Sequence, residues 1–418
     1  MIYMCLGIMT ILAIMALVIY RDFVCPLFLF YLPWIASIGL LIFSDYDYNP
    51  ESLAYAYIAA GGFLFFVGFM ISNHGMKMSK RYEKSTETYR VRQASVKCLI
   101  ILETLIAVYC FFDLYRIYKN FNYGNIYTSI MVPIRQGNAS LSSLTPYGLN
   151  LISVVTMCMV LAWFFVDKTE RRKVGGWIYI QLLIGGFATV ANLHRAGVLR
   201  NGLTIFVILI ICLNIRSRKL FWLAMLFGAG FIIFFGYFTT LKFSDNGQGK
   251  TRLILQHLSL YSSGGIVAFE KFFESQPELL WGQQMFRVVY EVAGRVVGTT
   301  GGINLIQKFI DIGDGVTTNV YTIYAYYIAD FGKIFGLFMQ FLLALGYGVI
   351  YKIMVNKKAV GIFVFAISIY PLIMQFFAEQ YFAMLSQWVQ CILVAIVFFE
   401  TDIFLIRKQL KVMEECKQ

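Results

Sequence analysis

Charged side chains are scarce in this sequence, and so are the residues that build soluble catalytic centres. Only 14% of the 418 positions are charged and histidine occurs three times, whereas 59% of the residues are hydrophobic. Soluble globular proteins are nearer half apolar and a quarter charged. The mean hydropathy of +0.69 therefore excludes an ordinary soluble domain and indicates a chain that folds in lipid.

The apolar runs lack the strict alternation of barrel strands and are about twenty residues long, which suits membrane-spanning helices. A bilayer core offers no water to satisfy backbone groups, so helices are the structure that such runs can form there. We therefore expect an all-α polytopic membrane protein of about eleven transmembrane helices. The expected spans lie near residues 2–19, 24–43, 54–72, 98–115, 148–166, 177–193, 203–215, 220–241, 334–351, 359–377 and 387–404.

No basic segment precedes the first apolar run, because the first charged side chain, Arg21, follows it. We therefore interpret this run as a retained first span and not as a cleaved signal peptide. Short connections rich in lysine and arginine alternate along the chain with connections that carry few or none. Basic connections stay on the cytoplasmic side, so we expect the N-terminus outside and the C-terminus in the cytoplasm.

One connection is far too long for a simple loop between helices. We accordingly divide the chain into residues 1–241 with eight spans, residues 242–333 as a large extracytoplasmic loop, and residues 334–418 with three spans and a cytoplasmic tail. The apolar stretches 253–273 and 285–297 predict short helices within the loop. The long connections lie on the outer side, whereas the inner connections are short. We therefore expect the functional site to lie on the outer side.

Motifs for nucleotide hydrolysis and metal catalysis are missing: no P-loop, Rossmann glycine fingerprint or HExxH pattern occurs in a supporting context. None of the eight cysteines lies between Lys242 and Lys333, so the long loop has no thiolate metal site. We expect neither a metal nor a cofactor. The formal net charge of +12 does not indicate a nucleic-acid partner, because the basic residues form short blocks between apolar runs.

The outer segments do contain arginine. Its planar guanidinium binds phosphate oxygens in pairs, and its charge is costly beside hydrocarbon unless an anion meets it. The alternative is that these side chains reach lipid headgroups or pair with Glu270, Glu291 or Asp314. We infer a site for an anion, with Arg195, Arg252, His257 and Arg287 as candidate catalytic residues and Arg135, Arg200 and Arg295 as candidate substrate-binding residues.

Two further groups of residues are candidates for function. Segment 116–147 contains basic residues and no acidic residue, interleaved with aromatic side chains. Aromatic side chains outside the membrane could stack on sugars, although an interfacial aromatic belt is the alternative explanation. We place Tyr321 and Tyr324, with Asn319, in the candidate substrate-binding set. Charged residues inside spans are functional candidates by default, which adds Glu103 and Asp113.

One stretch goes beyond generic membrane patterning. Residues 317–322 read Thr-Thr-Asn-Val-Tyr-Thr, and Asp330-Phe331-Gly332 follows them. Together with Leu193-His194-Arg195-Ala196-Gly197 and Ser262-Ser263-Gly264-Gly265, this stretch resembles the oligosaccharide repeat-unit polymerases (Wzy-type, O-antigen polymerase family). The resemblance covers the span count, the loop order and residues 190–350.

The resemblance implies a GT-C-like enzyme of the bacterial inner membrane that acts at the periplasmic face without a metal. A growing glycan on undecaprenyl pyrophosphate would move onto the terminal sugar of a new lipid-linked repeat unit, in O-antigen lipopolysaccharide or capsule synthesis. Arginines would stabilise the pyrophosphate leaving group. The acceptor hydroxyl needs a base or a hydrogen-bond acceptor, and the candidates are His257, Asp245, Glu270 and Asp330.

The expected partners are the undecaprenyl-pyrophosphate-linked oligosaccharide and the lipid bilayer, with a chain-length regulator protein as a further candidate. Other function classes stay open. An O-antigen ligase-like glycosyltransferase would use similar arginines, and a flippase or transporter of lipid-linked oligosaccharide would also be polytopic. Transporters of this kind usually contain internal repeats, and no repeat of useful strength occurs in the sequence.

Overall fold

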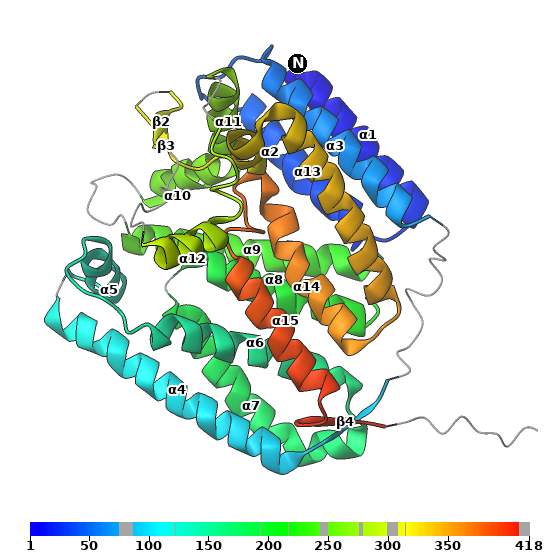
Figure 1. The fold of residues 1–418 in the computed structure, drawn as a ribbon, viewed down its shortest axis with the longest axis vertical. Coiled ribbons are helices and arrows are strands. Elements are labelled where there is room, and N and C mark those ends of the chain that lie inside the picture. The colour runs from blue at the N-terminus through cyan, green and yellow to red at the C-terminus, as the bar shows by residue number, and fades with distance from the viewer. Residues whose placement is uncertain are drawn as a thin grey trace, which may run out of the picture. The chain divides into compact units, whose positions relative to one another are not determined.

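The computed structural model describes residues 1–74, 87–121, 123–192, 194–215, 217–242, 250–275, 279–298, 308–313 and 315–408. The structure is 76% helical, so the chain is an all-α polytopic membrane protein (Figure 1). Nine of the described helices are long and apolar enough to cross a membrane. They are α1 (Ile2–Tyr20), α3 (Leu53–Ser72), α4 (Gln93–Asn120), α6 (Leu144–Phe165), most of α7 (Lys168–Ala191), α8 (Arg195–Cys212), most of α9 (Ser217–Lys242), α13 (Ile323–Val355), and α14 (Ala359–Ile373) with the 3-10 turn η3 (Met374–Phe376).

Two shorter apolar helices, α2 (Pro26–Ile42) and α15 (Leu385–Glu400), coincide with two more of the expected spans. The remaining helices are too short to cross a bilayer. Within 242–333, where the sequence predicts short helices, the chain forms α10 (Lys250–Ser259), η2 (Leu260–Gly264), α11 (Gly265–Glu274) and α12 (Arg287–Val297). Helix α5 (Ile126–Arg135) lies between α4 and α6 in sequence.

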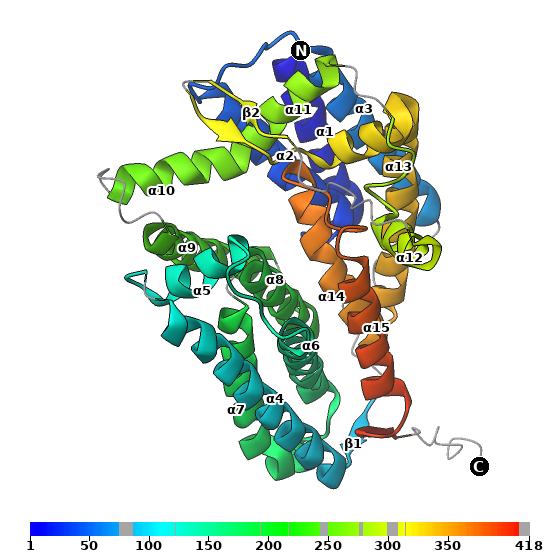
Figure 2. The same ribbon diagram turned by 60° about the vertical axis from the view of Figure 1, so that its left-hand side comes forward.

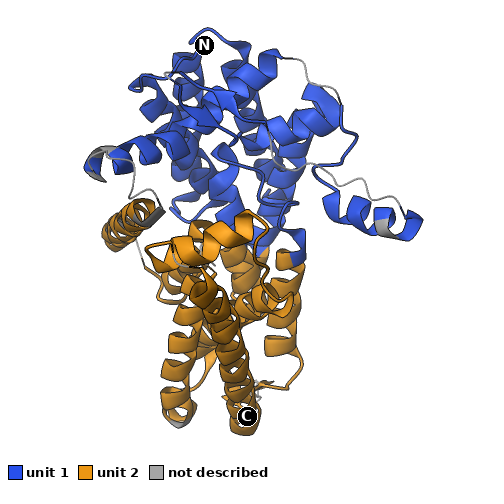
Figure 3. Ribbon diagram, turned by 90° about the vertical axis from the view of Figure 1, so that its left-hand side faces the viewer, with its two compact units in different colours: residues 1–78, 248–352, 368–386 blue, residues 79–247, 353–367, 387–418 orange. Residues whose placement is uncertain are grey.

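The chain divides into two compact units, each assembled from separate segments (Figure 3). Unit 1 comprises residues 1–78, 248–352 and 368–386, and unit 2 comprises residues 79–247, 353–367 and 387–418. Helices α13, α14 and α15 contribute residues to both units. Each unit therefore joins early and late parts of the sequence.

In unit 1, helices α1, α2 and α3 pack against one another, and α13 packs against α3 (Figure 1). Glycines on α3 allow α13 to approach it closely. A Cβ atom on Gly61 would lie 2.1 Å from the hydroxyl oxygen of Tyr324, and one on Gly68 would lie 2.7 Å from the backbone oxygen of Phe341. Small residues at helix crossings allow such approach in membranes, where tight packing replaces hydrophobic attraction.

In unit 2, α4, α6 and α7 pack against one another, and α8 packs on α6, α7 and α9 (Figure 2). Helix α5 packs on α4 and α9. A cluster of small and aliphatic side chains fills the centre of this bundle: Ala107, Cys110, Leu149, Ile152 and Ala188.

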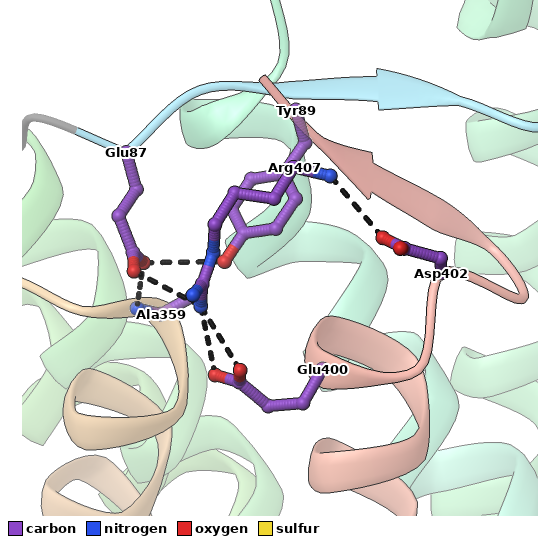
Figure 4. Close-up of polar contacts among 6 residues, drawn as sticks. All are labelled: Glu87, Tyr89, Ala359, Glu400, Asp402 and Arg407. Atoms are coloured by element: carbon purple, nitrogen blue, oxygen red, sulfur yellow. Dashed lines mark hydrogen bonds and ion pairs between the residues drawn. The ribbon is translucent and has the colours of Figure 1, made fainter. Parts of the chain in front are cut away.

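Unit 2 also contains a polar clasp between segments far apart in sequence. Strand β1 (Tyr89–Val91) pairs antiparallel with β4 (Leu405–Arg407) (Figure 4). The Arg407 guanidinium lies 3.1 Å from the carboxylate of Glu87 and 3.0 Å from that of Glu400. Burial raises the pKa of Tyr89, over whose ring the guanidinium lies, to about 12. The only other strands in the described residues, β2 (Ile310–Asp311) and β3 (Thr317–Thr318), form a two-stranded hairpin in unit 1.

Candidate functional site

Helix α8 begins with positive charge. Its N-cap is His194 and its first residue is Arg195, and its first turn contains no acidic side chain. The N-terminus of a helix already carries about half a positive charge, so a cation there is unfavourable unless an anion compensates it. The guanidinium of Arg195 donates to the hydroxyl of Thr239 at 3.1 Å and lies 4.5 Å from the centre of the Phe235 ring, both on α9.

Arg135 contributes to the same end of unit 2. It is the last residue of α5, which packs on α9 through Tyr127, Met131 and Phe238. The pKa of His194 is lowered from its ordinary value of 6.5, first because surrounding protein removes water from the ring and second because of the positive charge of Arg135. We name the cations Arg135 and Arg195, together with the neutral ring of His194, the α8 cation cluster.

Arg200 belongs to the same helix but to a different environment. Five residues after Arg195, it lies on another face of α8. It is buried, and its guanidinium donates to the side-chain oxygen of Asn150 at 3.1 Å and to that of Gln387. Asn150 in turn donates to Gln390 at 2.5 Å. Arg200 is therefore held inside the bundle by side-chain amides of α6 and α15.

Apart from Glu103 and Asp113, which are buried on α4 of unit 2, the other described candidate residues lie in unit 1. Arg287, the first residue of α12, pairs with Glu291 at 2.6 Å, which is the internal pairing that the sequence left open as an alternative. The ring of His257 on α10 lies 6.4 Å from that of Tyr261. The backbones of Arg252 and Arg295 belong to α10 and α12, but their side chains lie outside the described part of the structure, as do Leu193, Asp245 and Asp314.

The predicted sugar-binding residues of unit 1 are largely enclosed. Asn319 follows β3 and is partly exposed. Tyr321 is buried, and its hydroxyl donates to the backbone oxygen of Lys308 at 2.9 Å. Tyr324 is fully buried against Trp34 and Tyr57. Among the described residues, no hydrogen bond or ion pair links any of these three with Arg287.

The Asp-Phe-Gly segment shapes the backbone of unit 1. The carboxylate of Asp330 is fully buried and accepts hydrogen bonds from the backbone N–H groups of Gln284, at 3.0 Å, and Met285, at 2.7 Å. Gly332 has φ +82° and ψ 174°, a conformation reserved for glycine, and it kinks α13. This motif therefore fixes the 280–286 segment to the start of α13.

A second buried carboxylate lies in the loop before α15. Glu379 accepts backbone hydrogen bonds from Tyr381, Phe382 and Ala383, at 2.6, 2.9 and 2.7 Å. Burial nevertheless raises its pKa, because three N–H donors do not fully replace water. In the same way, burial raises the pKa of Glu270, which accepts from the backbone of Asn49 at 3.0 Å. Among the described residues, no group of three or more His, Cys, Asp and Glu side chains could hold a metal ion.

Sequence reasoning named the His194-Arg195 turn but placed His257, not His194, in the catalytic set. The effect of Arg135 on His194 could not be found from spacing, because α6 and α7 lie between the two residues in sequence. The amides that hold Arg200 were missed as well. A signal for them existed: Asn150, Gln387 and Gln390 are polar residues inside apolar runs, a pattern that marks buried polar contacts.

Comparison with known proteins adds no relative: no protein-family model, no curated protein and no solved structure matches this chain.

Proposed function

We propose that the chain is a membrane glycosyltransferase that polymerises lipid-linked oligosaccharide repeat units at the outer face of the inner membrane. The observation that carries the proposal is the α8 cation cluster: His194 and Arg195 lie at the positive end of a membrane-spanning helix, and the charge of Arg135 acts on the His194 ring. Helix N-termini and guanidinium groups both favour phosphate oxygens. A pyrophosphate at the end of a lipid chain provides the anion that this position favours.

The reaction follows from the charges. The acceptor hydroxyl oxygen forms a bond to the anomeric carbon of the donor sugar, while the bond from that carbon to the pyrophosphate oxygen breaks. The electron pair leaves with the lipid pyrophosphate, where Arg135 and Arg195 stabilise the developing negative charge. The lowered pKa of His194 keeps its ring neutral at neutral pH, so the ring can accept the proton of the hydroxyl.

Purified protein and undecaprenyl-pyrophosphate repeat units from the host strain test this proposal. We expect a ladder of glycan multiples without any nucleotide sugar and in the presence of EDTA. Arg195→Ala should lower the rate roughly 100- to 1,000-fold, as loss of one preorganised charge contact does in other enzymes. Arg195→Lys should restore little, because an ammonium group does not reproduce the bidentate geometry.

Arg90→Ala is the matched control, since it removes an exposed arginine of strand β1 in the same unit. Normal ladders from Arg195→Ala and Arg195→Lys would contradict the proposed role of the cluster. In a parallel reaction with lipid A added as acceptor, transfer of the glycan to lipid A instead of to another repeat unit would identify a ligase.

A second candidate is a transporter of lipid-linked oligosaccharide, and a polar network inside unit 1 favours it. Gln340 on α13 donates to Gln375 at 2.7 Å, Gln375 donates to Tyr381 at 2.8 Å, and Tyr347 donates to Tyr381 at 3.1 Å. Polar residues within membrane spans commonly mark transport pathways. If the purified protein forms no ladder but moves the lipid-linked unit across liposomes, the transporter is the correct function.

A further inference from the structure

A cavity with both polar and apolar walls lies in unit 2 at the C-terminal end of α4. Its volume is about 380 Å³, within the range of small-molecule sites, about 300–1,000 Å³. Its lining includes Arg116, Asn120, Phe121, Gly137, Asn138 and Ser140. These residues belong to the basic and aromatic segment 116–147, most of which the α8 cation cluster does not use.

This cavity is positioned beyond the apolar part of the spans. Helix α4 has 28 residues, so it is roughly 42 Å long at about 1.5 Å per residue, against about 30 Å for a bilayer core. Basic Arg116 and Lys119 and polar Asn120 occupy its last turn and a half. A ligand in the cavity therefore meets water and headgroups and not hydrocarbon tails.

One wall of the cavity is rigid before any ligand binds. After α5, the N–H of Gly137 donates to the backbone oxygen of Ile134 at 3.2 Å, and the N–H of Asn138 donates to that of Pro133 at 2.9 Å. These two bonds form a Schellman motif, which requires the left-handed conformation that Gly137 adopts with φ +74°. Preorganisation of this kind lowers the entropy lost on binding.

The charges of the lining favour a neutral ligand. Arg116 pairs with the buried carboxylate of Asp113 at 2.9 Å and donates to the backbone oxygen of Ser140 at 3.0 Å. Asp113 is itself fixed by the Ser142 N–H at 2.9 Å and the Thr145 hydroxyl at 2.6 Å. Because the guanidinium is already neutralised, the cavity has little excess charge to attract a phosphate.

The polar and aromatic groups match a sugar. Asn120 and Asn138 each offer an amide that both donates and accepts, as sugar hydroxyl groups do. Phe121 is partly exposed, and its ring is nearly parallel to that of Tyr123, with centroids 6.5 Å apart and planes 9° apart. An aromatic face provides the apolar surface on which the C–H face of a pyranose ring can lie.

We propose that this cavity is a saccharide-binding subsite for the glycan of the lipid-linked substrate, an inference that rests on the proposed function. Arg135 of the α8 cation cluster is separated from Gly137 of the cavity wall by one residue. A pyrophosphate held by the cluster would therefore have its sugars beside the cavity. The subsite determines which repeat unit binds, whereas the cluster binds the part common to every lipid-linked substrate.

Binding measurements with the full-length protein in nanodiscs test the two sites separately. The first probe is the repeat-unit oligosaccharide of the host strain, released from its lipid by mild acid and measured by saturation-transfer NMR. The second probe is inorganic pyrophosphate. We expect Asn138→Ala and Phe121→Leu to weaken oligosaccharide binding at least about tenfold, equivalent to about 1.4 kcal/mol, and to leave pyrophosphate binding unchanged.

Two controls complete the experiment. Phe112→Leu truncates an aromatic side chain that is 61% exposed on the same helix but outside the cavity, and it should bind both probes normally. Arg195→Ala should lose pyrophosphate and keep the oligosaccharide. Normal oligosaccharide binding by both cavity variants, or displacement of the oligosaccharide by pyrophosphate, would overturn the saccharide subsite. Normal pyrophosphate binding by Arg195→Ala would instead overturn the proposed role of the cluster.

Discussion

The two units differ in the charge that they bury. Among the described residues, the buried Asp, Glu, Lys and Arg side chains of unit 1 are all acidic, namely Asp22, Glu270, Asp330 and Glu379. Unit 2 buries Glu103 and Asp113 and, in addition, the basic side chains of Arg200 and Lys357.

The partners of these charges differ as well. Each buried carboxylate of unit 1 accepts at least one backbone N–H from a loop or a helix end: Val24 for Asp22, Asn49 for Glu270, Gln284 and Met285 for Asp330, and Tyr381, Phe382 and Ala383 for Glu379. The bases of unit 2 donate to amide and carbonyl oxygens: Asn150 and Gln387 for Arg200, and Ile211 and Asn214 for Lys357. Unit 1 thus uses buried charge to fix its backbone. Unit 2 instead compensates its buried positive charge with the oxygen atoms of neutral groups.

The largest expected effect comes from removing a backbone-fixing carboxylate. Asp330→Ala leaves two buried N–H groups without acceptors, which should lower the free energy of unfolding by about 2–5 kcal/mol. Asp330→Asn retains one good acceptor and should cost about half as much. Thermal unfolding of detergent-purified protein measures both.

Asp45→Ala provides the control, because it removes an exposed acidic side chain from the same unit. If Asp330→Ala unfolds at the same temperature as Asp45→Ala, buried carboxylates do not hold unit 1 together and the contrast between the units is lost.

A smaller effect is expected from Arg200→Lys in unit 2. The ammonium group cannot reach the amides of Asn150 and Gln387 with the fork geometry of arginine, so at least one buried oxygen loses its donor. The expected cost is about 1–3 kcal/mol. Arg90→Lys, at an exposed position, should leave the unfolding temperature unchanged. Equal unfolding temperatures of the two variants would show that Asn150 and Gln387 do not require the guanidinium geometry of Arg200.

The smallest effect concerns the pKa of His194, which NMR of the protein labelled at histidine Cε1 can follow. The His194→Asn variant identifies its signal among those of the three histidines. We expect a pKa below 6.5, and Arg135→Gln should raise it because one of its two causes is removed. The folded state binds this proton less tightly than the unfolded chain does. The contribution of His194 to stability is therefore present above pH 6.5 and is lost as the pH falls through the folded-state pKa.

An unchanged His194 pKa in Arg135→Gln would show that the charge of Arg135 does not act on His194, and it would contradict the α8 cation cluster. The pKa of His257 serves as the internal reference, because that ring belongs to unit 1.

Much of the fold could be predicted because lipid imposes a simple rule. Apolar runs of about twenty residues must become helices, and α1, α3, α6 and α13 lie close to expected spans. The assembly of the units could not be predicted. Residues 368–386 belong to unit 1 because of contacts such as that between Gln340 of α13 and Gln375, and no spacing or periodicity in the sequence encodes contacts between distant helices.

The site was predictable only as a set of residue types. Arginine in a short outer turn indicated an anion, but hydropathy does not show which face of α8 each arginine occupies. Arg195 and Arg200 were both assigned to one anion site, yet Arg195 contacts Thr239 and Arg200 contacts Asn150. The cavity beside Phe121 depends on a Schellman motif after α5, and a glycine followed by asparagine gives only a weak signal for that motif.

The pairing of β1 with β4 has a consequence for biosynthesis. Strand β1 precedes β4 by roughly 300 residues. At a synthesis rate of about 5–20 residues per second, β4 is made on the order of 15–60 s after β1. During that interval Glu87 lacks the guanidinium of Arg407, and all helices from α4 to α15 are synthesised before the clasp can form. The clasp can therefore form only after α15 has been synthesised. The folding of unit 2 is completed only after its membrane spans have been made.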